Sequence, residues 1–222
     1  MGGQLEKQFM LLAGRPLLWH TLQTFETSPW IRGVVVVVPK HRVEFVWEEM
    51  VRPGGFSKVL EVVEGGAERQ ESVRRGLRSI GDGWDIVMVH DGARPLITAE
   101  LIARCVEQTI IWGATVAAVP ATDTIKEVDP QGFVERTHPR ERLWMVQTPQ
   151  TFRYHWIMAA HERAWREGFS GTDDSSLVER LGVKVRVVNG SYENIKVTTP
   201  ADLRLAEEIL LRRGVPKSWV SE

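Results

Sequence analysis

Short apolar runs recur along the chain at intervals that suit buried strands. Val34–Val38 is five consecutive valines followed by Pro39, and it is apolar on both faces, as a strand inside a parallel sheet must be. The same interpretation applies to three further runs and to one later alternating run, namely Val59–Val63, Ile86–Val89, Ala114–Val119 and Val183–Val188. These runs are short and rich in β-branched residues, so we expect them to be strands of one sheet.

Between the strands lie longer stretches with helical periodicity. In Pro16–Phe25, for example, Leu18, Leu22 and Phe25 fall on one side. Further helices are expected at Arg42–Val51, Glu68–Ile80, Ala99–Trp112, Tyr154–Glu167, Asp174–Leu181 and from Pro200 to Gly214. Alternating strands and helices of these lengths suit right-handed βαβ units. The sequence therefore predicts an α/β fold with a doubly wound, mostly parallel sheet in one domain over residues 1–222.

One stretch, residues 121–147, breaks this alternation. It reads as short extended pieces around the turn tetrad Asp129-Pro130-Gln131-Gly132. We expect a β-hairpin arm that leaves the sheet. Because an isolated hairpin is marginally stable in water, the arm should pack on a partner subunit, the alternative being a surface flap. The polar segment Gln147-Thr148-Pro149-Gln150 at its end is expected to form a compact turn.

Composition and charge narrow the class of protein. Of the 222 residues, 43% are hydrophobic and 26% charged, no apolar run approaches the length of a membrane span, and the amino terminus does not resemble a secretory signal. A net charge of −1 argues against a basic nucleic-acid-binding face. The single cysteine, Cys105, cannot form an internal disulfide, which favours the cytoplasm. The six histidines lack zinc-site spacing, so we expect no protein-ligated transition metal.

The clearest chemical signal is the segment Ile86 to Pro95, where an apolar run ends in Asp91, Gly92 and Arg94. Ligands of open α/β sheets bind outside the carboxyl ends of the strands, which is where these side chains are expected. A carboxylate there can hold a divalent cation, and a guanidinium can bind a phosphate through two hydrogen bonds. The alternative is a structural Asp-Arg pair in a polar turn.

Two segments combine glycine or lysine with an expected helix start. The loop that begins at Gly65-Gly66-Ala67 precedes a helix, where backbone N–H groups can approach an anion, although it can also be a plain β-to-α turn. Lys7 follows the glycines at positions 2 and 3 and suits a phosphate site, although a solvated lysine is the alternative.

Three polar segments near the carboxyl end complete the candidates. Lys196 precedes a helix start and is a second candidate cation, with Thr199 as a helix cap. The acid pair in Thr172-Asp173-Asp174 could bind a metal, but a helix cap is the favoured interpretation. The spacing of Gln147–Gln150 from Arg140 is compatible with both contacting one anionic ligand.

Seven blocks occur in order along the chain: Lys-Gln-Phe, Gly-Gly-x-Glu-Arg-x-x-Ser-Val, His-Asp-Gly-Ala-Arg-Pro, Ala-Thr-Asp-Thr-Ile-Lys, Leu-Trp-x-x-Gln-Thr-Pro-Gln-x-Phe, Thr-Asp-Asp and Asn-Ile-Lys-Val-Thr. With these blocks the chain resembles the 2-C-methyl-D-erythritol 4-phosphate cytidylyltransferases of the non-mevalonate isoprenoid pathway, from Met1 to about Arg212. The resemblance implies that a polyol phosphate attacks the α-phosphorus of CTP, so that pyrophosphate leaves and a CDP-polyol forms. Such a reaction needs positioning and cationic stabilisation rather than covalent catalysis.

The resemblance also implies roles for individual residues. Lys7 and Lys196 would be the catalytic cations, and Asp91 would lie beside the polyol and the phosphates that carry Mg²⁺, the expected cofactor. The nucleotide would contact a second set of residues, namely Gly66, Ala67, Arg69, Ser72 and Gly92. The polyol phosphate would contact a third set, namely Asp91, Arg94, Thr124, Arg140 and Thr148. The arm would join two subunits into a homodimer and lend residues to the neighbouring site.

Three alternatives stay open at this point. Ribitol-5-phosphate cytidylyltransferases share most of these blocks, although Ala93, Leu143 and Trp144 favour the methylerythritol family.

The resemblance also implies a first strand and a glycine-rich phosphate loop upstream of residue 1, so we expect the sequence to be shortened at its start, for example by a misassigned start codon. In that shortened form CTP binding should be weak, and a non-catalytic binding subunit is the third alternative. A dehydrogenase is set aside because no Gly-x-Gly-x-x-Gly follows a strand.

Overall fold

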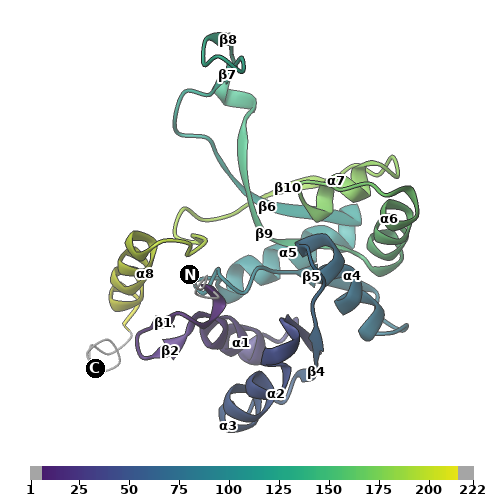
Figure 1. Ribbon diagram of the computed structural model, residues 1–222, viewed down its shortest axis with the longest axis vertical. Coiled ribbons are helices and arrows are strands. Elements are labelled where there is room, and N and C mark those ends of the chain that lie inside the picture. The colour runs from purple at the N-terminus through teal and green to yellow at the C-terminus, as the bar shows by residue number, and fades with distance from the viewer. Residues whose placement is uncertain (1–6, 215–222) are drawn as a thin grey trace.

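The computed structural model describes residues 7–214, which form a body of strands and helices with one long projection (Figure 1). The strands are β1 (Leu11–Leu12), β2 (Arg15–Pro16), β3 (Val34–Val38), β4 (Val59–Glu64), β5 (Ile86–Val89), β6 (Ala114–Pro120), β7 (Lys126–Val128), β8 (Val134–Thr137), β9 (Trp144–Arg153) and β10 (Arg186–Asn189). The helices are α1 (Leu17–Thr27), α2 (Val43–Val46), α3 (Arg52–Gly54), α4 (Arg69–Ser79), α5 (Ala99–Trp112), α6 (Tyr154–Glu167), α7 (Asp174–Glu179) and α8 (Pro200–Arg212). An α/β architecture is confirmed.

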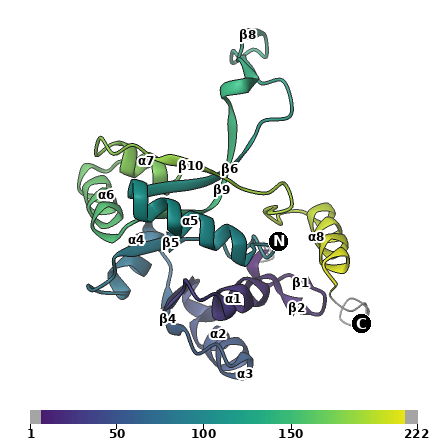
Figure 2. The same cartoon turned by 180° about the vertical axis from the view of Figure 1, so that it is seen from behind.

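The central sheet has the strand order β10-β6-β9-β5, with helices on both faces. On one face, α4, α6 and α7 pack a core around Phe152 of β9. On the other, Cys105 of α5 packs on Ala117 of β6, and the view from behind shows α5 crossing the sheet (Figure 2). Alternate residues of the apolar strands thus serve opposite faces, which is why β6 is apolar at almost every position.

The expectation of a mostly parallel sheet is wrong in one respect. Strand β9 runs antiparallel to both of its neighbours, β5 and β6, while β10 pairs with β6 and β3 with β4 in parallel. The β3-β4 pair is separate from β5 among the described residues. Strand β5 therefore pairs on one side only, and Ile86–Val89, which we expected to be fully buried, is partly exposed at every residue.

Strand β9 also overturns the turn expected at Gln147–Gln150. These four residues lie inside the strand and are buried, and the Thr148-Pro149 peptide bond is cis. The polar side chains tolerate burial because they are hydrogen-bonded. The Gln150 amide donates to the Asp173 carboxylate at 2.7 Å, and its carbonyl accepts from the Ser175 N–H at 2.9 Å.

The expected hairpin is present as β7 and β8, at the end of the projection (Figure 1). Asp129 stabilises its turn, because its carboxylate accepts hydrogen bonds from the N–H groups of Gln131 and Phe133. All residues of β7 and β8 are exposed in the single chain. We call residues 121–147 the arm.

The helix limits follow their capping residues. Asp173 and Thr199 cap α7 and α8 with capping boxes, so the cap interpretation of Thr172-Asp173-Asp174 is confirmed for Asp173. The expected helix Arg42–Val51 is present but contains a π-helical turn at Trp47–Val51. The late strand is shorter than expected and begins at Arg186, which pairs with Thr115 near the start of β6. Among residues 7–214, no helix has the length and apolarity to cross a bilayer.

Candidate active site

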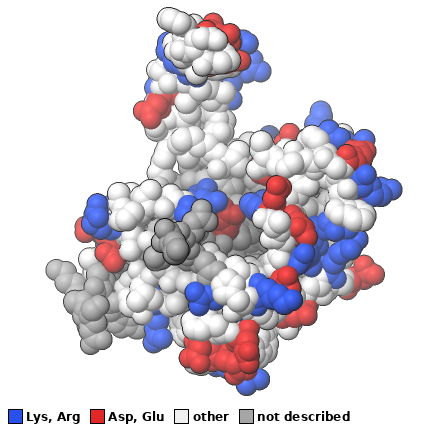
Figure 3. Space-filling view, viewed as in Figure 1, with Lys and Arg blue, Asp and Glu red and all other residues white. Residues whose placement is uncertain are grey.

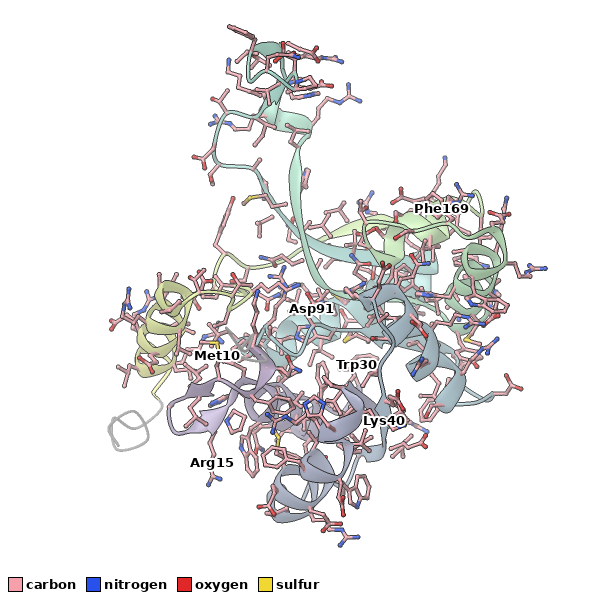
Figure 4. The ribbon with its side chains drawn as sticks, in the orientation of Figure 1. Met10, Arg15, Trp30, Lys40, Asp91 and Phe169 are labelled. Atoms are coloured by element: carbon pink, nitrogen blue, oxygen red, sulfur yellow. The ribbon has the colours of Figure 1, made fainter. Side chains whose placement is uncertain are left out.

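Asp91 lies at the centre of the candidate site, directly after strand β5 and near the middle of the body (Figure 4). One carboxylate oxygen accepts from Arg69 Nε at 3.2 Å, and the other contacts Lys196 Nζ at 2.8 Å. Burial alone would raise the pKa of Asp91. The hydrogen bond from Lys196 and the charge of Arg69 outweigh burial and lower this pKa to about 2, so the carboxylate is ionised at neutral pH.

Lys196 reaches Asp91 because the loop before α8 lies against the Asp91–Arg94 turn. The Val197 N–H donates to the Ala93 carbonyl at 2.8 Å, which fixes the loop beside the turn. The Lys196 side chain is 45% exposed, so its ammonium group remains accessible to a ligand. A cation that is paired in the free protein and still open to solvent can exchange its partner for a phosphate.

Arg69 connects this site to the helical layer behind it. Its NH2 group donates to Asp174 at 2.7 Å, and Asp174 also pairs with His161 Nε2 at 3.1 Å. The side chains of Asp174 and His161 are each only 1% exposed. Burial would raise the pKa of Asp174, but the hydrogen bond from His161 and the charge of Arg69 lower it. Arg69 is thus held at both ends by carboxylates.

The Arg94 side chain leaves the same turn in another direction. Its NH1 group donates to the Asn194 carbonyl at 2.7 Å, while its Nε is buried and has no hydrogen-bond partner among the described residues. Asn194 is two residues before Lys196, so Arg94 and Lys196 are tied to the same loop. A guanidinium with an unused donor is suited to bind a phosphate.

Two further residues fix the backbone at Asp91. Thr148 of β9 accepts a hydrogen bond from the Asp91 N–H at 3.1 Å and lies 3.0 Å from His90 Nδ1. Burial lowers the pKa of His90 to about 4, so its ring is neutral at neutral pH. Thr148 was among the residues expected at the site, whereas His90, which lies in the block His-Asp-Gly-Ala-Arg-Pro, was not.

The glycine loop differs from its expected form. The Gly66 N–H donates to Ser72 Oγ at 3.0 Å, and the Ala67 N–H donates to Glu71 Oε2 at 2.9 Å. In the free protein, side chains from the first turn of α4 therefore satisfy the N–H groups of both Gly66 and Ala67. A ligand at this loop must displace the Glu71 side chain, which is also bound by Arg75.

Lys7 is exposed at the start of the described chain, in the 3-10 helix Lys7–Phe9. Its neighbour Gln8 lies beside the Asp91–Arg94 turn, since a Cβ atom at Gly92 would be 3.7 Å from Gln8 Cβ. Charged side chains of both signs gather around a hollow at the centre of this face (Figure 3). The structure thus brings Asp91, Arg69 and Lys196 into contact, and it places Gln8, the residue after Lys7, beside Gly92.

Thr124 and Arg140 lie on the arm, outside this cluster. Arg140 NH1 donates to the Thr122 carbonyl at 2.8 Å, and Thr124 and Arg140 are both exposed. Thr148, by contrast, is buried in β9, so a ligand shared by Arg140 and Thr148 stays a prediction.

Comparison with known proteins identifies the class and the family. The family model for 2-C-methyl-D-erythritol 4-phosphate cytidylyltransferase matches residues 1–212. The enzyme of this name from Geotalea uraniireducens is 51% identical over 212 residues, which cover 95% of this chain and 91% of that protein. The one from Dehalococcoides mccartyi strain CBDB1 is 47% identical over 215 residues, covering 96% and 91%.

Solved structures agree with the sequence relatives. The crystal structure of 4-diphosphocytidyl-2C-methyl-D-erythritol synthase from Anaerococcus prevotii has a TM-score of 0.86 and 30% identity, and the match covers 95% of this chain and 92% of that one. The 2-C-methyl-D-erythritol 4-phosphate cytidylyltransferase structure from Thermus thermophilus has a TM-score of 0.77 and 36% identity, covering 92% and 94%. The chain is therefore an α/β nucleotidyltransferase. It belongs to the 2-C-methyl-D-erythritol 4-phosphate cytidylyltransferase family.

Proposed function

We propose that this protein transfers the cytidylyl group of CTP to 2-C-methyl-D-erythritol 4-phosphate. A phosphate oxygen of the polyol attacks the α-phosphorus of CTP, the bond between the α-phosphorus and the bridging oxygen breaks, and pyrophosphate leaves with that oxygen. The observation that carries this proposal is Asp91, held between Arg69 and Lys196 at the end of β5. Family membership and relatives of this name support the same activity.

The chemistry of the site follows from its charges. Lys196 and Lys7 would neutralise the triphosphate and the charge that builds on the phosphoryl oxygens in the transition state. Arg94, with its unused Nε, would bind the phosphate of the polyol, and Asp91 would face the polyol itself. The remaining proposed contacts are those of the nucleotide with Gly66, Ala67, Arg69, Ser72 and Gly92, and those of the polyol phosphate with Thr124, Arg140 and Thr148.

We propose Mg²⁺ as the cofactor, carried mainly by the triphosphate of CTP. Among the described residues, no group of three or more His, Cys, Asp or Glu side chains is placed to hold a metal ion. Asp91 offers one ionised carboxylate, which suits Mg²⁺ because proteins often bind it through one or two carboxylates together with substrate phosphates. When bound, the ion would neutralise phosphate oxygens and align the triphosphate.

The assay for this function measures pyrophosphate release with CTP and either polyol phosphate. We expect release with 2-C-methyl-D-erythritol 4-phosphate and Mg²⁺, and at least tenfold lower kcat/KM with ribitol 5-phosphate, because a site built for one polyol leaves polar groups unpaired with another. Chelation by EDTA should stop the release, and added Mg²⁺ should restore it. No release with any polyol phosphate would favour the non-catalytic binding subunit instead.

We further propose that the fold is a doubly wound, Rossmann-like nucleotidyltransferase fold in which the arm joins two subunits. The arm of each subunit would complete the site of the other. Three apolar side chains of the hairpin support this, because Val128 is 54%, Phe133 73% and Val134 57% exposed in the single chain. A two-stranded hairpin with this composition gains stability by packing on a partner. The reaction would take place in the cytoplasm, in keeping with the single, buried Cys105.

Subunit mixing tests whether the site is shared. Arg140→Ala and Lys196→Met should each inactivate the homodimer, whereas a refolded equal mixture should recover about a quarter of the wild-type activity, because half of the dimers are mixed and each has one intact site. Lys40→Met, at a lysine outside the arm whose side chain is 82% exposed, serves as the control and should leave activity unchanged. A mixture that remains inactive, although light scattering shows mixed dimers, would contradict the shared site.

A further inference from the structure

His90 is bound through both nitrogens of its ring, and these contacts define its tautomer. His90 Nε2 lies 3.1 Å from the Arg94 carbonyl oxygen, which can only accept a hydrogen bond. Nε2 therefore carries the proton, and Nδ1 has a free lone pair in the neutral ring. Thr148 Oγ1, 3.0 Å from Nδ1, must then donate to it. The same oxygen accepts from the Asp91 N–H, so Thr148 uses its hydroxyl in both directions.

Asn194 closes these contacts into a ring of hydrogen bonds. Arg94 NH1 donates to the Asn194 carbonyl at 2.7 Å, and Asn194 Nδ2 donates to the Thr148 carbonyl at 2.8 Å. Thr148 and Asn194 are only 4% and 1% exposed, so their part of the ring is shielded from competing water, whereas His90 and Arg94 are partly exposed. We call these four residues, His90, Arg94, Thr148 and Asn194, the hydrogen-bond ring.

The ring joins three separate segments of the chain where the site is assembled from them. His90 and Arg94 belong to the turn that follows β5, Thr148 to β9, and Asn194 to the loop that carries Lys196. Asp91 and Arg94 lie within the enclosed turn, and Lys196 is two residues from Asn194. A shift of any one segment would change the distances from the Asp91 carboxylate to the Arg94 guanidinium and to the Lys196 ammonium group. Because phosphoryl transfer depends on positioning, about 1 Å of displacement can cost roughly 100-fold in rate.

We propose that His90, whose Nε2–H donates to the Arg94 carbonyl, and Asn194 are positioning residues that hold Asp91, Arg94 and Lys196 in one catalytic arrangement. This inference rests on the proposed cytidylyl transfer for its kinetic consequences. Neither His90 nor Asn194 is proposed to contact the substrates. Both act through Asp91, Arg94 and Lys196, which are proposed to do so. An ordinary buried histidine, packed edge-on against Phe25 at 5.4 Å, would stabilise the fold without this effect on turnover.

Substitutions at His90 separate its two hydrogen bonds. His90→Leu removes both, His90→Gln can still donate to the Arg94 carbonyl, and His90→Asn can still accept from Thr148. We expect His90→Leu to lower kcat about 10- to 100-fold and to raise KM for the polyol phosphate, with a smaller change for CTP, because the ring holds Arg94 directly. The glutamine and asparagine variants should each recover part of kcat. His155→Gln, an exposed substitution on α6, should match the wild type.

Combining His90→Leu with Asn194→Ala tests the ring as a unit. Once the ring is open, a second break has less to disrupt, so the double variant should lose clearly less than the product of the two single losses. Circular dichroism and denaturant unfolding identify variants that have simply lost the fold. A folded His90→Leu variant with wild-type kcat and KM would overturn the proposal, as would fully multiplicative losses.

A nuclear magnetic resonance measurement tests the ring without any turnover. In protein labelled with ¹⁵N-histidine at pH 7, long-range correlation spectra should show a proton on Nε2 of His90. In Thr148→Val, which removes the hydroxyl donor, the Nδ1 resonance should move. A His90 ring without a proton on Nε2 would overturn the proposal even in an active enzyme. If the wild type releases no pyrophosphate, the proposed function fails, and this spectrum still decides whether the ring exists.

Discussion

Replacing Lys196 by methionine is expected to lower kcat by about 10²- to 10³-fold, the range found when one preorganised group that stabilises the transition state is removed. Methionine keeps the apolar stem and removes the charge, so Asp91 retains only Arg69 as a cationic partner. The ammonium group is partly exposed and accounts for little of the fold's stability. Pyrophosphate release at saturating concentrations of both substrates measures the effect.

The matched control is Lys40→Met, the same substitution at a lysine whose side chain is 82% exposed and lies 3.9 Å from Glu64. That variant should keep wild-type kcat and KM. If Lys196 acts in the transition state, kcat and kcat/KM should fall by similar factors, whereas a rise in KM for CTP alone would indicate ground-state binding. A Lys196→Met enzyme within about twofold of the wild-type kcat would contradict the catalytic role.

The strands and helices that the sequence predicts best are those whose signal is local. Val34–Val38 is a strand with the expected limits, because five valines before a proline have few other ways to be buried. Helices α5 and α6 also have the expected limits, since each ends at a glycine, Gly113 and Gly168, in the left-handed conformation. In these cases the residues that begin or end an element lie within it or beside it.

Strand β9 was missed because its identity depends on distant partners. The polar sequence Gln147–Gln150 has no strand periodicity, and a proline inside it argues against a central strand. It becomes a strand because β5 and β6 flank it and because Asp173, Ser175 and Ser191 satisfy its two glutamine side chains. None of these partners lies near it in sequence, so no local pattern could have indicated the strand.

The sequence likewise predicted only part of the candidate site. That Asp91 would lie at the end of a strand follows from the apolar run before it. Its contact with Lys196 joins two segments that were each expected to bind a ligand. Arg69 was expected to contact the nucleotide, but its link between Asp91 and Asp174 was not expected, and Asp174 is 105 residues from Arg69 in the chain. His90, Asn194 and His161 carried no signal beyond their places in or near the blocks, since their roles arise from three-dimensional hydrogen bonding.

Replacing Asp174 by alanine is expected to lower the free energy of unfolding by about 3 kcal/mol, the lower end of the range for breaking a buried ion pair. Asp174 is the acceptor for both Arg69 NH2 and His161 Nε2, and the His161 side chain is only 1% exposed. His161 would lose its partner in a site that water does not reach. Arg69 would be less affected, because its side chain is 39% exposed and still contacts Asp91. The expected loss of stability is therefore at the lower end of that range. Urea unfolding monitored by tryptophan fluorescence measures the change.

The pH dependence of this effect separates a charge interaction from a packing defect. Because the pKa of Asp174 is lowered in the folded protein from its ordinary value of 3.8, its contribution is present above that pH and is lost as pH falls through the lower, folded value. The difference between Asp174→Ala and the wild type should therefore be largest near neutral pH and shrink in acid. Asp82→Ala, at an exposed loop, should stay within about 0.5 kcal/mol of the wild type. A difference that is constant from pH 7 to pH 3 would mean that lost packing, rather than the lost carboxylate, destabilises the variant.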